Sequence, residues 1–280
     1  MNSSENPVDK LKWIMGQLRD PKTGCPWDLK QTFQTVVPFT LEEAYEVADA
    51  IERHDMQDLK EELGDLLFQV VFYSQLAKEE GHFEFDAVVE AISEKLIRRH
   101  PHVFSSENFE TAAEVMVNWE QEKARERSAK ASNNIQESVL DNIPQALPSL
   151  TRSYKLQKRC AQVGFDWEKP QEALEKVKEE ILEVQEELNH FEDKSDTTRH
   201  QKLEEELGDL FFALVNVARK LEFDPEMTLR KANQKFERRF RGVETALFTK
   251  GSSPEKSSLV EMDLLWDEIK AQEKSGKKSQ

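Results

Sequence analysis

Pairs of carboxylates three residues apart recur at matching places in the two halves of the chain. In the second half they are Glu180 with Glu183 and Glu206 with Asp209. This spacing places both members of a pair on one face of a helix. Two such helices packed antiparallel would bring the pairs together, where the carboxylates repel one another unless protons or cations neutralise them. Because ligation by carboxylate oxygens suits Mg²⁺ or Mn²⁺, the pattern predicts a magnesium site that could also take manganese.

The first half carries the same pattern, as Glu43 with Glu46 and Glu62 with Asp65. For any single pair the alternative is a solvated acidic face, which is common on surface helices. Recurrence with the spacing intact favours metal binding, so these residues form a second candidate set. We expect it to be the weaker of the two, because the basic residues around it differ.

Gly64 and Gly208 stand beside these carboxylates, inside predicted helices. Glycine inside a helix destabilises it by about 1 kcal/mol relative to alanine. A glycine kept at both positions therefore indicates that another helix approaches the backbone closely there.

Basic residues form the second group of candidates. Lys235, Arg238 and Arg239 follow Asn233 on a predicted helix. As a group they could bind phosphate oxygens that a metal leaves unmatched. The alternative for each residue is a solvated face, on which it pairs with a neighbouring glutamate.

Two further lysines each precede a proposed ligand by four residues: Lys176 precedes Glu180, and Lys202 precedes Glu206. They either contact a substrate phosphate or sugar or form ordinary ion pairs along the helix. The first half lacks the matching residues, since Phe39 replaces Lys176, Asp58 replaces Lys202 and Ser93 replaces Asn233. On charge alone, the second half is therefore the better anion site.

The elements that must position these residues are helices. Segment 60–68, KEELGDLLF, matches segment 204–212, EEELGDLFF, and further segments match in the same order. Apolar residues within them recur with helical periodicity. We therefore expect a duplicated unit in which an acidic helix and an apolar helix form a hairpin. The predicted division is an N-terminal helical domain over 1–126, a linker over 127–147 and a second domain over 148–280.

The composition limits the classes of protein to be considered. The chain of 280 residues has only 9 glycines and 10 prolines, too few for the turns of a strand-rich fold, so we expect an all-α protein. A net charge of −16 argues against broad binding to nucleic acid polymers. No apolar stretch is long enough to span a bilayer, and the distant Cys25 and Cys160 suit a reducing compartment. We expect a cytoplasmic protein that does not associate with a membrane.

The sequence also resembles a known family. The EExxE and EExxD arrangement of both halves is similar to that of the MazG nucleoside triphosphate pyrophosphohydrolases of the full-length, two-repeat bacterial type. The strings GCPWD, KRCAQVGFDW and KANQKFERRF strengthen the resemblance. It implies tandem all-α bundles that form a homodimer, and hydrolysis of nucleoside triphosphates to monophosphates and pyrophosphate with broad base tolerance. A role in cleaning the nucleotide pool or in stress would accompany that activity.

The resemblance also assigns roles to residues. By the resemblance, metal binding falls on Glu180, Glu183, Glu206 and Asp209. From their position beside these ligands, either Glu179 or Glu205 could accept the proton of the attacking water. Lys235, Arg238 and Arg239 would stabilise charge on the phosphates. Trp266 lies on a predicted helix beyond the repeat and would contact the nucleotide. The full set of expected substrate contacts is Lys176, Val177, Lys178, Glu179, Glu180, Lys202, Leu203, Glu204, Glu205, Asn233, Lys235, Phe236, Glu237, Arg238, Arg239 and Trp266. The alternative function is a non-catalytic helical scaffold or regulatory protein, whose acidic clusters are solvated or bind metal structurally.

Overall fold

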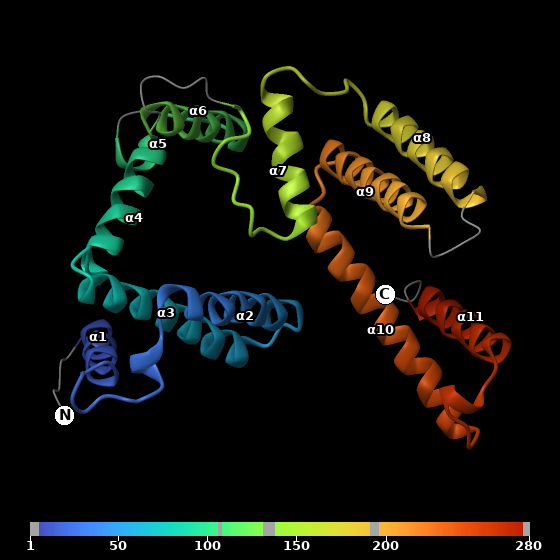
Figure 1. Cartoon of the computed structure of the whole chain (residues 1–280), viewed down its shortest axis with the longest axis horizontal. Helices are drawn as coiled ribbons and strands as arrows, with labels where there is room; N and C mark the ends of the chain where they lie inside the picture. Colours follow the sequence, from blue (N-terminus) through green and yellow to red (C-terminus); the bar gives the residue numbers. More distant parts are fainter. Residues whose placement is uncertain (1–5, 106–107, 131–137, 191–195, 277–280) are drawn as a thin grey trace. The chain divides into compact units, whose positions relative to one another are not determined.

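The computed structural model describes residues 6–105, 108–130, 138–190 and 196–276. Within these ranges the chain consists of helices joined by turns, without any strand (Figure 1). The prediction of an all-α protein is confirmed. Among the described helices, none combines the length and the apolar character needed to cross a bilayer.

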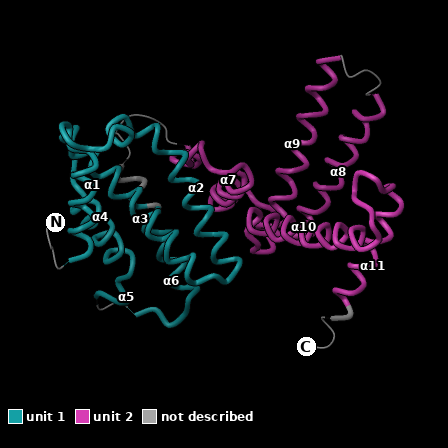
Figure 2. The backbone as a smooth tube through the Cα atoms, turned by 90° about the horizontal axis from the view of Figure 1, so that it is seen from below, with its two compact units in different colours: residues 1–132 teal, residues 133–280 magenta. Residues whose placement is uncertain are grey.

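The chain divides into two compact units, residues 1–132 and 133–280 (Figure 2). The expected linker over 127–147 lies at this division. Its first residues belong to helix α6, which extends to Lys130, while 131–137 lie outside the described residues. The following segment contains turns up to helix α7, which begins at Ser149.

Unit 1 is built around a helical hairpin. Helices α2 and α3 pack side by side, and α1 packs on α3 (Figure 1). The remaining helices follow in order after the hairpin. The bounds are α1 (Pro7–Leu18), η1 (Asp28–Lys30), α2 (Phe33–Glu52), α3 (Met56–Glu79), α4 (Phe85–Arg99), α5 (Pro101–Phe104) and α6 (Ala112–Lys130).

Local capping residues fix the ends of the hairpin helices. The side chains and backbones of Thr32 and Thr35 form a reciprocal capping box that starts α2 at Phe33, well before the acidic stretch expected to be helical. Pro38 lies inside this first part of the helix. The Asp55 side chain accepts hydrogen bonds from two backbone N–H groups at the start of α3. These caps set where each carboxylate lies along its helix.

Unit 2 repeats the hairpin with α8 and α9, which pack side by side (Figure 1). Asp196 caps α9 and Asp224 caps α10, each through side-chain hydrogen bonds to backbone N–H groups. Helix α7 packs on α9, as α1 packs on α3 in unit 1. The bounds are α7 (Ser149–Gln162), α8 (Pro170–Asn189), α9 (Thr197–Lys220), α10 (Pro225–Thr249), η2 (Pro254–Lys256) and α11 (Leu259–Gly276).

The buried core of unit 1 lies where α1 meets the hairpin. Met15, Val36 and Phe72 pack there together with Val71 and Leu76. This cluster draws on α1, α2 and α3, so it holds the leading helix against both arms of the hairpin.

Unit 2 has a core cluster between α10 and α11, formed by Val243, Leu247 and Leu265. Gly242 allows the close approach of the two helices. A Cβ atom at Gly242 would lie 2.9 Å from Cδ1 of Ile269, closer than real contacts allow. This contact seats α11, which carries Trp266, firmly on α10.

Large apolar side chains remain exposed on the hairpin helices. They include Leu67 on α3, Leu182 on α8 and Phe211 on α9. A Cβ atom added at Gly64 or Gly208 would meet nothing within 4 Å. The expectation of a close helix approach at these glycines is therefore wrong within the described part of this chain, because the neighbouring helix of the hairpin passes on another side.

Candidate metal centre

The second acidic cluster joins the two arms of the unit 2 hairpin. Glu180 on α8 and Glu206 and Asp209 on α9 each offer a carboxylate oxygen, and these oxygens all lie within 4.8 Å of one another. Glu180 is only 4% exposed, whereas Asp209 is open to solvent. Like charges this close, with one of them buried, are stable together only when protons or cations compensate them.

Glu183 adjoins this cluster without belonging to its tightest group. Its carboxyl shares a hydrogen bond with Glu180, which is the main cause of a pKa raised above the ordinary value. Burial and the negative charges of Glu180 and Glu206 raise the pKa further, while Lys176 opposes them. Helix geometry explains the offset, because a residue three positions after Glu180 lies almost one turn further along α8.

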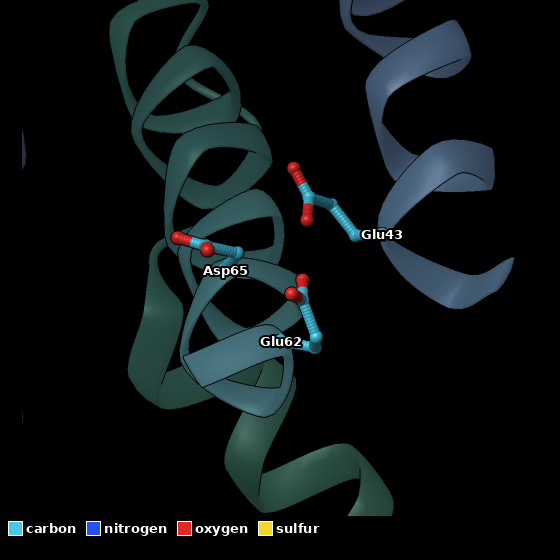
Figure 3. A group of neighbouring side chains, drawn as sticks. All are labelled: Glu43, Glu62 and Asp65. Atoms are coloured by element: carbon cyan, nitrogen blue, oxygen red, sulfur yellow. The ribbon is translucent and has the colours of Figure 1, made fainter. Parts of the chain in front are cut away.

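The first acidic cluster has the same form. Figure 3 shows Glu43 reaching from α2 toward Glu62 and Asp65 on α3, and their carboxylate oxygens lie within 4.8 Å of one another. Burial raises the pKa of Glu43, and the nearby charges of Asp65, Glu46 and Glu62 raise it further. Glu46 also shares a hydrogen bond with Glu43, so it repeats the position of Glu183.

The two clusters differ in the positive charge beside them. The Nζ atom of Lys176 lies 2.7 Å from Oε1 of Glu180 and 2.7 Å from Oε1 of Glu179. In the first unit the matching residue is Phe39, whose ring packs edge-on against Trp27 at 5.7 Å between centroids. Among the residues that the structure describes, an ammonium group therefore contacts a cluster carboxylate in the second cluster only.

The two candidate proton acceptors lie one residue before a cluster member. Glu179 is exposed on α8 and ion-paired with Lys176, and Glu205 is exposed on α9. The expected contacts on α9 precede Glu206 along the helix, with Lys202 and Glu204 exposed and Leu203 half-buried. Residues 202–205 thus lie on α9 between the α8–α9 connection and Glu206, and Glu179 directly precedes Glu180 on α8.

The predicted basic group gathers at a different place. Arg238 and Arg239 on α10 both pair with Glu273 on α11, at 2.9 Å and 2.8 Å. The Arg239 guanidinium also lies over the ring of Trp266, and Phe236 packs against the same ring. The structure thus brings Arg238, Arg239, Phe236 and Trp266 together. Within the described residues it pairs the arginines with Glu273 rather than with the acidic cluster.

The remaining residues of this group lie on the outside of α10. Asn233, Lys235 and Glu237 are exposed, and Glu237 lies within ion-pair distance of Arg241. Glu237 and Arg241 therefore form an exposed ion pair on the surface of α10, which is the alternative to phosphate binding considered above for the basic residues.

Unit 1 contains the same arrangement of two arginines on one glutamate, which we call an arginine clamp and which the sequence alone did not predict. Arg98 and Arg99 at the end of α4 both pair with Glu126 on α6, each at 2.5 Å. Trp119, seven residues before Glu126, donates its indole N–H to the Arg99 carbonyl oxygen. Trp266 precedes Glu273 by the same seven residues. The final helix is therefore part of the duplication, and the expectation that Trp266 lies beyond the repeat is wrong.

Comparison with known proteins matches this duplicated architecture. The model of the MazG nucleotide pyrophosphohydrolase domain matches the chain twice, over residues 31–104 and 168–243. The chain belongs to the MazG family. Each matched segment contains one acidic hairpin and the arginine pair that follows it, while α6 and α11 lie outside the matched segments.

Full-length MazG relatives are similar over nearly the whole chain. The nucleoside triphosphate pyrophosphohydrolase of Escherichia coli (strain K12) is 52% identical over 268 residues, which cover 96% of this chain and 98% of that protein. A Thermotoga maritima protein named nucleoside triphosphate pyrophosphohydrolase/pyrophosphatase MazG is 40% identical, covering 94% of this chain and 95% of its own. The crystal structure of a MazG-related protein from Thermotoga maritima gives a TM-score of 0.36 at 27% identity, over 42% of this chain and 99% of that one.

Proposed function

We propose that the protein is a Mg²⁺-dependent nucleoside triphosphate pyrophosphohydrolase, with Mn²⁺ able to replace Mg²⁺. Water would attack the α-phosphorus, the bond from that phosphorus to the bridging oxygen would break, and pyrophosphate would leave. The observation that carries the proposal is the meeting of Glu180, Glu206 and Asp209 within 4.8 Å. The relatives named for this activity, similar over nearly the whole chain, support it.

The donor set fits a hard divalent cation. All its members are carboxylates, which suit Mg²⁺ or Mn²⁺, and no sulfur or imidazole lies among them. Lys176 compensates a single charge, so the cluster keeps an excess of negative charge that a divalent cation would neutralise. When bound, the cation would neutralise charge on the phosphates and orient the attacking water.

The chain's own residues then divide the work. Glu179 or Glu205 accepts the proton of the water, and Glu180, Glu183, Glu206 and Asp209 hold the metal. Phosphate charge is met by Lys176, Lys202, Lys235, Arg238 and Arg239. The other nucleotide contacts are Val177, Lys178, Leu203, Glu204, Asn233, Phe236, Glu237 and Trp266. Glu273 would hold the Arg238 and Arg239 guanidinium groups together and oriented before substrate arrives.

The active form in this proposal is a homodimer. Leu182, Phe211 and Leu214 expose large apolar surfaces on the hairpin that bears the metal site. Such side chains on the outside of a helical pair are characteristic of surfaces that pack against another helix. A second copy of the same hairpin would cover them and complete a four-helix bundle around the acidic residues.

The test compares matched variants of the two clusters. Glu206→Gln removes one charge from the second cluster and Glu62→Gln removes its counterpart from the first. We expect Glu206→Gln to abolish release of pyrophosphate from mixed nucleoside triphosphates, while Glu62→Gln retains most of it and both variants keep the wild-type circular dichroism spectrum. EDTA should stop the wild-type reaction. A non-catalytic scaffold would release no pyrophosphate in any of these samples.

A further inference from the structure

Glu273 on α11 binds both arginines of the unit 2 clamp through one edge of each guanidinium group. The Nε atom of Arg238 donates to Glu273 Oε1 at 2.9 Å, and its Nη2 atom lies 2.9 Å from the same oxygen. The Nε atom of Arg239 donates to Glu273 Oε2 at 2.9 Å, and its Nη2 atom lies 2.8 Å from that oxygen. Each carboxylate oxygen therefore takes the side edge, formed by Nε and Nη2, of one guanidinium group.

This arrangement leaves the end edge of both guanidinium groups, formed by Nη1 and Nη2, for other acceptors. A guanidinium group has five N–H groups, and a side edge uses only two of them. Among the described residues, neither the Nη1 atom of Arg238 nor that of Arg239 has a hydrogen-bond partner. The end edge is a planar fork that matches two oxygens of a phosphate group. Both arginines thus keep a phosphate-binding fork that Glu273 does not use.

The packing of α11 on α10 determines where the Glu273 carboxylate lies. Ile269 packs against Gly242, where an added Cβ atom would lie 2.9 Å from Ile269 Cδ1. Glu273 follows Ile269 by four residues, and Arg238 and Arg239 precede Gly242 by four and three residues. Residues at these spacings share a helix face, so one turn later on α11 meets one turn earlier on α10. Arg239 and Glu273 are only 16% and 23% exposed, and their packing restrains them.

An aromatic ring restrains Arg239 at its flat face. The Cζ atom of Arg239 lies 5.7 Å from the centre of the Trp266 ring, and Phe236 packs against the same ring. Trp266 precedes Glu273 by seven residues, about two helical turns, so both lie on one side of α11. Helix α11 therefore holds Arg239 at its flat face and at its side edge, and only the end edge remains for a ligand.

The clamp of unit 1 holds its arginines differently. Arg99 donates from Nε and from Nη2 to the two oxygens of Glu126, and Arg98 reaches Glu126 Oε1 through Nη2 without its Nε atom. Attachment at two nitrogens fixes the plane of a guanidinium group, whereas attachment at one nitrogen lets the plane turn. Both guanidinium planes are therefore fixed in unit 2, and only that of Arg99 is fixed in unit 1.

We infer that Glu273 is a positioning residue, which fixes both guanidinium planes so that the end edges of Arg238 and Arg239 bind phosphates of the nucleoside triphosphate. This role rests on the proposed function and adds a residue of α11 to it. Donors that are already oriented bind more tightly, because less conformational entropy is lost on binding. Helix α11 lies outside segment 168–243, which the MazG domain model matches, so the functional site extends beyond the matched domain.

A carboxylate between two arginines is also the arrangement of an internal competitor, which would leave when a phosphate binds. The atoms in contact favour positioning, because Glu273 takes the side edges and not the end forks. Hydrogen bonds from Arg239 and Arg238 hold the pKa of Glu273 below its ordinary value, so the carboxylate stays ionised at neutral pH. The two roles predict opposite results when the charge is removed, since a positioning residue strengthens phosphate binding and a competitor weakens it.

The first experiment compares the same substitution in the two clamps. Glu273→Gln keeps the size of the side chain and removes its charge, and Glu126→Gln does the same in unit 1. We expect Glu273→Gln to raise KM for ATP, and the calorimetric Kd for a non-hydrolysable α,β-methylene analogue of ATP, by about fivefold. Glu126→Gln should leave both within about twofold of wild type. Unchanged or tighter binding by Glu273→Gln would overturn the inference.

The second experiment separates positioning from a purely structural role in seating α11. Arg238→Lys combined with Arg239→Lys keeps both positive charges beside Glu273, but an ammonium group has no plane to orient. Adding Glu273→Gln in that background should change Kd for the analogue by less than about twofold, because residues that act through one another do not add. A further fivefold loss there would show that Glu273 acts through the packing of α11 and would overturn the inference. A wild-type protein that binds the analogue but releases no pyrophosphate would overturn the proposed reaction alone, because the binding measurements need no turnover.

Discussion

The Nζ atom of Lys176 lies 2.7 Å from Oε1 of Glu180, the most buried carboxylate of the second acidic cluster. Hydrogen bonds to Glu179 and Glu180 raise the pKa of Lys176, so the ammonium stays charged at any physiological pH. The first cluster has Phe39 at the matching place. From this contrast we predict that the second cluster binds a phosphorylated ligand more tightly than the first, although both have the same carboxylates.

Replacing Lys176 with Met should destabilise the metal-free protein by about 1 kcal/mol, because Glu180 would be left buried without its partner. We reduce the figure for solvent screening, since the Lys176 side chain is 39% exposed. Added Mg²⁺ should narrow the difference, because the cation also satisfies Glu180. The matched control is Lys178→Met, which breaks an exposed pair with Glu175 on the same helix. Urea unfolding with EDTA and with Mg²⁺ measures both effects, and equal losses in the two variants would contradict the role of Lys176.

Phe39→Lys should give the first cluster an ammonium group at the place where Lys176 lies beside the second cluster. The new ammonium would lie one turn before Glu43, whose pKa is raised by burial and by its acidic neighbours. We expect the affinity of this cluster for Mg²⁺-tripolyphosphate to rise about twofold to fivefold, the scale of one partly exposed ion pair. Calorimetry in a Glu206→Gln background isolates the first cluster. Identical isotherms with and without the new lysine would count against charge as the difference between the units.

The acidic clusters should make stability depend on pH when metal is absent. The hydrogen bond shared with Glu180 raises the pKa of Glu183 above its usual 4.5, and burial and negatively charged neighbours raise it further. Just above pH 4.5 the folded state therefore binds more protons than the unfolded state. Stability should therefore fall as the pH rises through this window. Thermal melts in EDTA should show the decline, Glu183→Gln should flatten it, and saturating Mg²⁺ should reverse it because metal binding needs ionised carboxylates. A profile in EDTA that Glu183→Gln leaves unaltered would refute this account.

Glu126 should make the stability of the folded protein depend on pH in the opposite sense to Glu183, and at lower pH. Hydrogen bonds from Arg99 and Arg98 lower the pKa of Glu126 from 4.5 to about 2. A depressed carboxyl pKa stabilises the folded state above the unfolded value, and this contribution is lost as the pH falls from about 4.5 toward 2. Because Arg98 is 50% exposed, we expect Glu126→Gln to cost about 1 kcal/mol at neutral pH. Acid titrations followed by circular dichroism should converge for the variant and wild type near pH 2, and parallel curves would contradict the prediction.

The features that the sequence predicted well are those carried by local spacing. Helical periodicity and the three-residue interval between Glu206 and Asp209 depend only on α-helix geometry. The amino-acid sequence therefore predicted both the helical hairpins and the proximity of their carboxylates. Thr32 shows where local signals were overlooked, since its capping box moves the start of α2 to Phe33.

The features that the sequence did not predict depend on contacts between distant segments. Glu126 serves arginines that lie 27 and 28 residues earlier in the chain, and Glu273 serves arginines 34 and 35 residues earlier. The α6 sequence WEQEKARE over 119–126 does match the α11 sequence WDEIKAQE over 266–273, but only the two arginine clamps show what the shared glutamate does. In the sequence, Gln157 likewise resembles any polar residue of an amphipathic helix. The structure shows that it is buried and that its Nε2 donates a hydrogen bond to the Phe212 carbonyl oxygen on α9.

The position of Glu206 and Asp209 on one face of α9, opposite Glu180, has a consequence for how such a protein can change. Each added residue turns an α-helix by about 100°, so a single insertion between Glu206 and Asp209 would turn Asp209 away from Glu180. Substitutions on this face of α9 change which side chains the helix presents to a bound cation or substrate and how tightly they bind it. Gains or losses of a position would break the alignment itself, so natural variation in length should accumulate in the turns and spare this stretch of α9.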